Sequence, residues 1–160
     1  MVRNAIKLDQ VLLKDIATPR VVVFRLDETR EIAMIESEIF DWTFTRLPLY
    51  NPSNPELLTG YVTQRDIFRC IVQNVEPEKT LSKIARPIHT VPELMRADKL
   101  LSYFIENSEH ISAVVDEHGS LVGIVTLEDI LEELVGREIV DEYDQVGDLR
   151  KYAQTRRKQR

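Results

Sequence analysis

Residues 123–136 read Gly-Ile-Val-Thr-Leu-Glu-Asp-Ile-Leu-Glu-Glu-Leu-Val-Gly, a short β-branched run followed by a helical pattern. The β-branched start predicts a buried strand. From Leu127 onward, apolar residues recur at i, i+3, i+4, i+7 and i+8, which is the stripe of an amphipathic helix. Thr126 lies at the change of period, where a helix N-cap belongs, and Gly136 is a typical helix stop. The stretch therefore predicts a strand that leads directly into a capped helix.

The junction between Thr126 and Asp129 has two interpretations. In the first, the threonine hydroxyl and the aspartate carboxylate form a capping box that only completes the start of the helix. In the second, the junction binds a ligand, because free N–H groups and the positive end of the helix dipole attract a phosphate. Asp129, one turn into the helix, can then accept both hydroxyls of a ribose. A single junction does not decide between them.

The same junction occurs earlier in the chain. Residues 60–67, Gly-Tyr-Val-Thr-Gln-Arg-Asp-Ile, match residues 123–130 at an offset of 63. Residues 81–87 also match residues 13–19, at an offset of 68. The chain is therefore a tandem repeat whose units read β-α-β-β-α, and the first unit is longer, largely in its proline-rich loop. Two equivalent junctions favour the ligand interpretation, although the alternative, a helix cap that was duplicated with the fold, stays open.

This repeat predicts an α+β fold in which two β-α-β-β-α units pack through their sheets about a pseudo-twofold axis. One unit of this size buries too little surface to be stable by itself. We expect a lead-in helix and the first unit over residues 1–75, the second unit over 80–146 and a basic tail over 147–160. Such packing places both Thr-x-x-Asp junctions at the seam between the units.

The apolar periodicity also predicts the individual elements. Helices are expected at 4–17, from a cap at Asp27 or Thr29 to about Phe40, and at 64–75, 92–107 and 127–135. Strands are expected at 21–24, 46–50, 57–62, 88–91, 111–115 and 121–125. Pro48 indicates that its strand lies at a sheet edge, and Gly119 suits a hairpin turn.

Composition and charge exclude several classes of function. The 43% apolar share supports a globular core, and the sequence shows neither a transmembrane run nor a signal peptide. The single cysteine, Cys70, cannot form an internal disulfide, which fits a reducing compartment. Six of the 21 basic residues and none of the 27 acidic ones fall in 150–160, so an acidic body disfavours nucleic acid as a partner. The basic tail is either a solvated helix end or a contact for an anionic membrane or protein.

Catalytic and metal-binding patterns are weak. The sequence has no glycine-rich phosphate loop and no catalytic serine motif. Its three histidines do not have metal-ligand spacing, and Cys70 has no clear histidine partner. The acidic run between Glu132 and Asp144 can attract divalent ions, although a solvated helix face is the usual interpretation. We therefore expect neither an enzyme nor a metal site, and Mg²⁺ would arrive bound to a triphosphate.

Four segments carry a resemblance to a known family. They are residues 16–20 (Ile-Ala-Thr-Pro-Arg), 45–50 (Thr-Arg-Leu-Pro-Leu-Tyr), 110–119 (His-Ile-Ser-Ala-Val-Val-Asp-Glu-His-Gly), and 125–136 together with Asp141-Glu142-Tyr143-Asp144. The chain resembles tandem cystathionine-β-synthase (CBS) domains, the Bateman module. More narrowly, it is similar to the module of the cyclin-M/CorC-type magnesium and cobalt transporter family, which includes haemolysin-like proteins.

The resemblance implies a regulatory module on the cytoplasmic side of the membrane. It would bind an adenine nucleotide, either ATP with Mg²⁺ or AMP, and form a head-to-head homodimer. In full-length members the module follows a transmembrane domain, so we expect this chain to be a piece of a longer protein whose divalent-cation transport it controls. A dimerisation and protein-interaction scaffold that binds no nucleotide is the alternative.

The resemblance also implies where the nucleotide lies. Asp129 would hold the ribose, and Thr126 would face ribose or phosphate. The first repeat would supply the adenine and phosphate side through Thr18, Thr45, Arg46 and Leu47. Arg46 is the only basic residue among these, so we expect it to contact phosphate, with a surface ion pair as the alternative. A possible second site would contain Thr63 and Asp66, although Gln64-Arg65 departs from the Leu-Glu of the second repeat.

Overall fold

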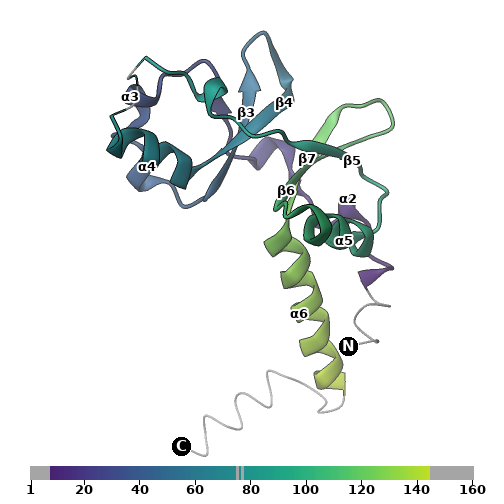
Figure 1. Cartoon of the computed structure of the whole chain (residues 1–160). Helices are drawn as coiled ribbons and strands as arrows, with labels where there is room; N and C mark the ends of the chain where they lie inside the picture. The colour runs from purple at the N-terminus through teal and green to yellow at the C-terminus, as the bar shows by residue number, and fades with distance from the viewer. Residues whose placement is uncertain (1–7, 75, 77, 145–160) are drawn as a thin grey trace, which may run out of the picture.

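The computed structural model describes residues 8–74, 76 and 78–144. Two units lie side by side, each with a sheet and flanking helices, and the helix α6 (Leu127–Asp144) extends away from them (Figure 1). The α+β class predicted from the sequence is confirmed. Within the described residues, no helix is both long and apolar enough to cross a bilayer.

The first unit is built on a three-stranded sheet in the order β2-β3-β4. Its strands are β2 (Leu26–Asp27), β3 (Arg46–Asn51) and β4 (Asn54–Thr63), with β2 parallel and β4 antiparallel to β3. The short helices α3 (Ile32–Ile35), η2 (Ile39–Asp41) and η3 (Leu81–Lys83) and the longer α4 (Gln64–Val72) complete it. Their apolar side chains form one core with the sheet, through residues that include Ile35, Leu47, Leu49, Val62, Ile67 and Leu81.

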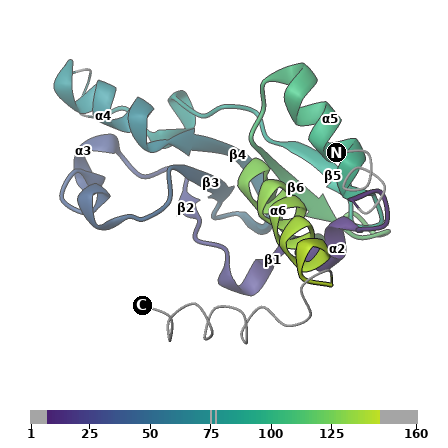
Figure 2. The same ribbon diagram turned by 90° about the horizontal axis from the view of Figure 1, so that it is seen from below.

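The second unit is built on a four-stranded sheet in the order β1-β7-β6-β5. These strands are β1 (Thr18–Pro19), β5 (His89–Pro92), β6 (Ile111–Val115) and β7 (Leu121–Thr126). The helices α2 (Leu13–Ile16) and α5 (Ala97–Asn107) pack with α6 on this sheet, as the view from below shows (Figure 2). Their core includes Leu13, Leu100, Phe104, Val114, Val125 and Ile130.

Each unit contributes a short segment to the sheet of the other. β1 precedes the first unit in the chain but pairs antiparallel with β7, where Thr18 faces Ile124 and Pro19 faces Gly123. In the equivalent place, Arg86 forms an antiparallel bridge to Tyr61 of β4, with N···O distances of 2.7 and 3.0 Å. The two exchanged segments are equivalent by the sequence repeat, as expected for two units related by a pseudo-twofold axis.

The exchanged segments approach the sheets too closely for a side chain at two glycines. A Cβ at Gly123 would lie 2.0 Å from the carbonyl oxygen of Thr18, and a Cβ at Gly60 would lie 2.7 Å from that of Arg86. Glycine is thus required at both positions by space rather than by backbone conformation. The two residues that begin the matching junctions in the sequence are the ones that allow the units to join.

The N-terminal segment differs most from the sequence prediction. Residues 4–7 of the helix expected over 4–17 lie outside the described residues. Of the remainder, Leu8 and the four-residue α2 are helical, and the chain between them is not, because Leu12 forms a bridge with Arg96. Residues 21–24, predicted as a strand, belong partly to the 3-10 helix η1 (Arg20–Val22), and Val21 is 84% exposed. The chain must leave the second sheet here to return to the first unit, and this connection overrides the β propensity of valine.

The segment after β2 forms shorter helices than predicted. The helix expected to end at Phe40 is divided into α3 and η2, although its inward isoleucines are buried as predicted, Ile32, Ile35 and Ile39. Asp27 does not cap it: its carboxylate accepts hydrogen bonds from the backbone and the hydroxyl of Thr29, which makes a local turn.

The edge assignment based on Pro48 is wrong, because β3 is the central strand of its sheet. The short β2 pairs only with Leu49 and Tyr50, so Pro48 has a partner strand on one side only, where it faces Tyr61. A proline is tolerated at this position because the other side of the strand is open.

Three helix ends also differ. α6 continues through Gly136 instead of stopping there, since a glycine costs a helix interior only about 1 kcal/mol. α4 ends at Val72, which is exposed rather than inward, and α5 begins at Ala97, which leaves Leu94 exposed. The predicted strand over 111–115 and the hairpin turn at Gly119, whose φ is 79°, are confirmed.

Candidate functional site

A cavity of about 520 Å³ lies at the seam between the units, and we call it the first cavity. Segments 18–24 and 43–48 contribute to it from the first repeat, and the β7–α6 junction contributes from the second. Its lining contains side chains of both kinds: the apolar ones include Val22, Phe24, Phe44, Pro48 and Ile124, and the polar ones include Thr18, Thr45, Arg46, Thr126, Glu128, Asp129 and Glu132. A ligand that carries both an apolar ring and polar groups suits this lining.

The β7–α6 junction forms the reciprocal cap that the sequence allowed. The backbone N–H of Thr126 donates to Oδ2 of Asp129 at 2.9 Å, and the backbone N–H of Asp129 donates to Oγ1 of Thr126 at 3.2 Å. Within the described residues, Oδ1 of Asp129 has no hydrogen-bond partner, while the residue lines the first cavity. Capping and ligand binding are therefore compatible here, because the cap uses only one carboxylate oxygen.

Arg46 connects the two units across the first cavity. Its Nη1 lies 3.6 Å from Oε1 of Glu128 at the start of α6, with the Arg46 side chain 25% exposed. This distance is longer than a charge-assisted hydrogen bond of about 2.8 Å, so the pair is a loose electrostatic contact. An incoming anion can replace Glu128 as the partner of the guanidinium.

The apolar wall contains residues that the sequence reasoning missed. Phe24 stacks on Phe44 with ring centroids 6.0 Å apart and an interplanar angle of 20°, and it also contacts Trp42 at 5.7 Å. Phe24 and Phe44 remain partly exposed and line the first cavity. The only sequence signal for them was the position of Phe44 beside Thr45, because Phe24 was assigned to a strand.

The structure brings most of the predicted residues together, with one exception. Thr18, Thr45, Arg46, Thr126 and Asp129 line the same cavity. Leu47 does not, because its side chain is fully buried in the core of the first unit. Successive strand residues point to opposite faces, so the arginine at 46 and the leucine at 47 cannot both face the seam.

The second junction is capped, but its carboxylate is already bound. Thr63 Oγ1 accepts the N–H of Asp66 at 3.0 Å. The guanidinium of Arg86 holds both oxygens of Asp66, with Nε to Oδ2 at 2.9 Å and Nη2 to Oδ1 at 3.1 Å. These bonds lower the pKa of Asp66 below its ordinary value of 3.8 and raise the pKa of Arg86. By the repeat offset Arg86 stands where the first cavity has Thr18, so a cation takes the place of a hydroxyl.

A second cavity of about 450 Å³ opens at the start of α4. Thr45, Arg46, Thr63, Gln64, Arg65, Phe68 and Arg86 line it. It shares Thr45 and Arg46 with the first cavity, so the two are adjacent. Three of its lining residues are arginines and none is acidic, which is the opposite of the charge at the β7–α6 junction.

Other reactive groups do not gather into a site. Within the described residues, no group of three or more histidine, cysteine or acidic side chains is placed to hold a metal ion. Cys70 is half-buried against the core of the first unit. His89 contacts Glu109 at 2.9 Å on the surface of the second unit, away from both cavities.

The family follows from a match to each repeat. A family model described as the CBS domain matches residues 13–73 and 81–136, which together exceed half of the chain. The chain belongs to the CBS domain family. We refer to it below as the CBS pair.

Curated relatives support the narrower resemblance. The CBS pair is 38% identical over 157 residues to a UPF0053 protein of Synechocystis sp., an alignment that covers 98% of this chain and 44% of that protein. It is 32% identical over 144 residues to the magnesium and cobalt efflux protein CorC of Vibrio cholerae, which covers 90% of this chain and 48% of CorC. The chain therefore spans less than half the length of these relatives.

Solved structures show the same fold with nucleotides. The CBS domain of a bacterial CNNM/CorC family Mg²⁺ transporter in complex with ATP aligns with a TM-score of 0.76 and 28% identity, covering 84% of this chain and 94% of that one. A CBS-domain pair with bound AMP from Klebsiella pneumoniae aligns with a TM-score of 0.68 and 30% identity, covering 79% and 99%. The resemblance to the CorC-type CBS module is confirmed.

Proposed function

We propose that this CBS pair is a regulatory module that binds one adenine nucleotide in the first cavity. The observation that carries the proposal is the composition of that cavity: an aromatic and aliphatic wall, a carboxylate oxygen without a partner among the described residues, and a loosely paired guanidinium. Adenine, ribose and phosphate need these three environments in this combination. That structural neighbours bind ATP or AMP supports the choice of ligand.

Each part of the nucleotide has a matching group in the cavity. Asp129 would accept the ribose hydroxyls through the oxygen that the cap leaves unused. The adenine would lie on the wall that contains Phe24 and Ile124, where its ring replaces water on apolar surface. Arg46 would leave Glu128 and bind phosphate, which restores a short charge-assisted bond to the guanidinium.

One nucleotide per chain is expected because the second junction lacks these groups. The Asp66 carboxylate that would hold a ribose is occupied by Arg86 on both oxygens. Breaking that ion pair would leave two charges without partners, and hydrogen bonds from the ribose hydroxyls would not compensate for this loss. The residues Thr63 and Asp66 are thus a cap and an ion pair in this proposal, not a nucleotide site.

Binding at the seam would link the nucleotide to the arrangement of the two units. The first cavity takes residues from both repeats, so an occupied cavity favours the arrangement in which Arg46 and Asp129 both reach the ligand. We propose that this signal controls a divalent-cation transport domain of a longer membrane protein, on the cytoplasmic side, with Mg²⁺ arriving on the triphosphate. Nucleotide binding cannot change the free-energy difference between two arrangements of the units by more than its own difference in binding free energy for them.

The CBS pair is also proposed to form a homodimer. Exposed apolar side chains gather on the first unit around α3 and α4, where Phe40 contacts Phe68 with ring centroids 5.4 Å apart. Met34, Phe40 and Val72 are 68%, 75% and 83% exposed. Large exposed apolar groups of this kind mark protein interfaces in soluble domains.

Calorimetric titration tests the nucleotide proposal. The chain, Asp129→Ala and Asp66→Ala are titrated with AMP and ATP, each with and without Mg²⁺, after circular dichroism confirms that each variant is folded. We expect a stoichiometry near one nucleotide per chain. The affinity should fall tenfold or more in Asp129→Ala and should be retained in Asp66→Ala. Both variants remove a carboxylate from the first turn of a helix, but only Asp129 lines the first cavity.

A second outcome would refute the proposal. If the folded chain binds none of the nucleotides, and none raises its melting temperature, the scaffold alternative replaces the regulatory one. A ligand that binds only the folded state must stabilise it by mass action, by about 2.7 kcal/mol at a hundredfold excess over Kd.

A further inference from the structure

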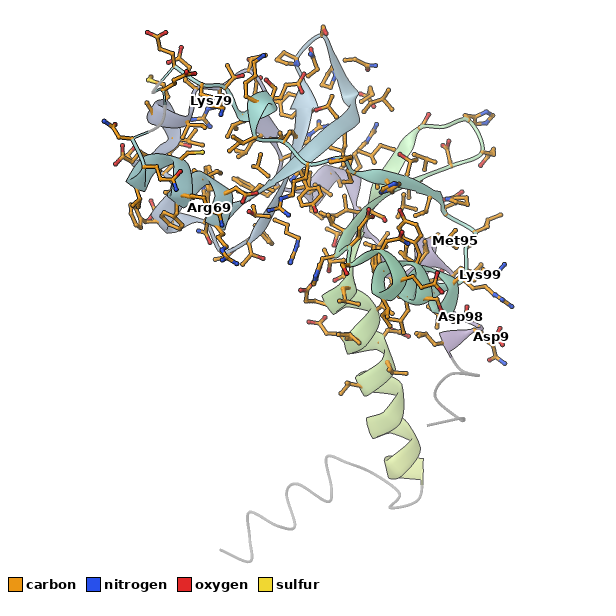
Figure 3. The ribbon with its side chains drawn as sticks, viewed as in Figure 1. Asp9, Arg69, Lys79, Met95, Asp98 and Lys99 are labelled. Atoms are coloured by element: carbon orange, nitrogen blue, oxygen red, sulfur yellow. The ribbon has the colours of Figure 1, made fainter. Side chains whose placement is uncertain are left out.

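Resting on the proposed function, we propose that Gln64 is a positioning residue for the first cavity. It holds the segment 39–45, which consists of η2 and the connection to β3 and which we call the η2 loop. Gln64 begins α4, the helix on which Arg69 is labelled in Figure 3, and it is not among the residues that line the first cavity. It therefore acts on the nucleotide through the η2 loop and not by direct contact.

Gln64 is bonded to both ends of the η2 loop. Its side-chain Nε2 lies 3.0 Å from the carbonyl oxygen of Ile39 and 3.4 Å from that of Trp42. Its backbone N–H donates to the carbonyl oxygen of Thr45 at 2.8 Å. The end of a helix leaves carbonyl groups without partners inside the helix, and the amide nitrogen is the atom of glutamine that can donate to them. One half-buried residue thus supplies donors to the start, the middle and the end of the loop.

The η2 loop supports Phe24 and Phe44, which we call the aromatic pair of the first cavity. Phe44 belongs to the loop and lines the cavity. Trp42, also in the loop, packs on the core of the first unit and contacts Phe24, whose ring stacks on that of Phe44. Because Phe24 contacts two side chains of the loop, a displacement of the loop would move both rings of the aromatic pair.

The second repeat shows what the glutamine adds. Leu127 is equivalent to Gln64 at the offset of 63, and its backbone N–H donates to the carbonyl oxygen of His110 at 2.9 Å. The backbone bond is therefore common to both junctions, whereas the side-chain amide belongs to the first alone. In the second unit the 11-residue α5 precedes β6, but in the first unit the helical segment before β3 is divided into α3 and η2. A divided helix leaves more carbonyl groups without helical partners, which gives a donor at Gln64 a role that Leu127 does not need.

Two substitutions of Gln64 separate its side-chain bonds from the stability of α4. Gln64→Leu introduces the residue of the second repeat, which has a similar helix propensity. Gln64→Glu keeps the length of the side chain but replaces the donating amide nitrogen by an acceptor, and a carboxylate suits the N-terminus of a helix. Gln73→Leu is the matched control, because Gln73 is exposed at the other end of α4 and is not among the residues that line either cavity.

Tryptophan fluorescence reports the η2 loop directly, because Trp42 is the only tryptophan of the chain. After circular dichroism confirms that each variant is folded, we expect both Gln64 variants to shift the emission of Trp42 to longer wavelength and to make it more accessible to quenching by acrylamide. A loop without its side-chain bonds exposes the indole to water. Gln73→Leu should change neither quantity.

Calorimetry then measures the affinities for AMP and ATP. We expect both Gln64 variants to lower the two affinities by the same factor, about fivefold, because the aromatic pair contacts the base that both nucleotides share. Gln73→Leu should leave both affinities unchanged. An unchanged Trp42 emission in the Gln64 variants, or a shifted emission with the affinities of the parent, would overturn the inference and leave the nucleotide site intact. An effect of Gln64→Leu without one of Gln64→Glu would also overturn it, since the added apolar side chain would then be the cause. Absence of nucleotide binding by the parent would instead count against the proposed function.

Discussion

Replacing Gly123 by alanine should uncouple the two units. A Cβ atom at this position would lie 2.0 Å from the carbonyl oxygen of Thr18 and 2.9 Å from its carbonyl carbon. A carbon–oxygen contact needs about 3.3 Å, so β1 must move away by roughly 1.3 Å. A backbone hydrogen bond of about 2.9 Å then stretches beyond about 4 Å, where it no longer exists.

The size of the effect follows from the shortness of β1. This strand consists of Thr18 and Pro19 alone, so a displacement removes it from the sheet entirely. Losing one or two backbone hydrogen bonds at about 1 kcal/mol each, with about 1–3 kcal/mol for overpacking, gives roughly 2–5 kcal/mol. With a urea m-value of about 2 kcal/mol/M, the unfolding midpoint should fall by about 1–2.5 M.

Urea denaturation followed by circular dichroism measures this change, with Gly136→Ala as the control. Gly136 lies inside α6 with nothing within 4 Å of its missing Cβ, so alanine there should raise the free energy of unfolding by about 0.5–1 kcal/mol. A midpoint for Gly123→Ala within about 0.2 M of the parent would refute the reasoning, because the units would then join without the close approach.

Three further predictions concern the second junction and the exposed face. Thr63→Ala should lower the free energy of unfolding by about 1 kcal/mol, seen as a lower melting temperature, because the Asp66 N–H loses its acceptor; an unchanged melting temperature contradicts this. Asp66→Asn should cost about 1–2 kcal/mol at pH 7. The pKa of Asp66 is lowered in the folded state, so the stabilisation by its ion pair is complete above pH 3.8 and is lost as the pH falls through the folded pKa. The urea unfolding midpoints of parent and variant should therefore converge as the pH falls through the folded pKa. Val72→Asp should convert a dimer into a monomer in sedimentation velocity without lowering the melting temperature of the monomer, and an unchanged sedimentation coefficient would place the interface elsewhere.

The sequence predicted those parts of the fold that depend on local periodicity and on the repeat. The strand–Thr-x-x-Asp–helix junctions, the strand over 111–115 and the turn at Gly119 all formed as expected. In these places propensity, hydrophobic pattern and turn chemistry agree. The match between residues 81–87 and 13–19 also located the exchanged segments, although their role in the opposite sheet was not anticipated.

The remaining features depend on contacts between distant residues, which local patterns do not contain. Val21, Val22 and Val23 favour a strand, but none of the strands that the structure describes pairs with this segment on its path between the units. The placement of Phe24 and Phe44 in the first cavity likewise depends on contacts between distant residues. The pairing of Arg86 with Asp66 joins residues 20 positions apart, and the sequence showed only that Arg86 replaces a threonine.

The exchange of β1 and the Arg86 segment has a consequence for the origin of the chain. A gene that encoded one unit alone would produce a protein with a strand that its own sheet does not receive. Two identical copies satisfy this need by lending each other the segment, so a single-unit ancestor would have been a homodimer with two equal junctions. In a single chain this association becomes an intramolecular contact that does not depend on protein concentration. The two junctions need not then be identical, and here Arg86 holds the carboxylate of one while the other leaves a carboxylate oxygen outside its cap.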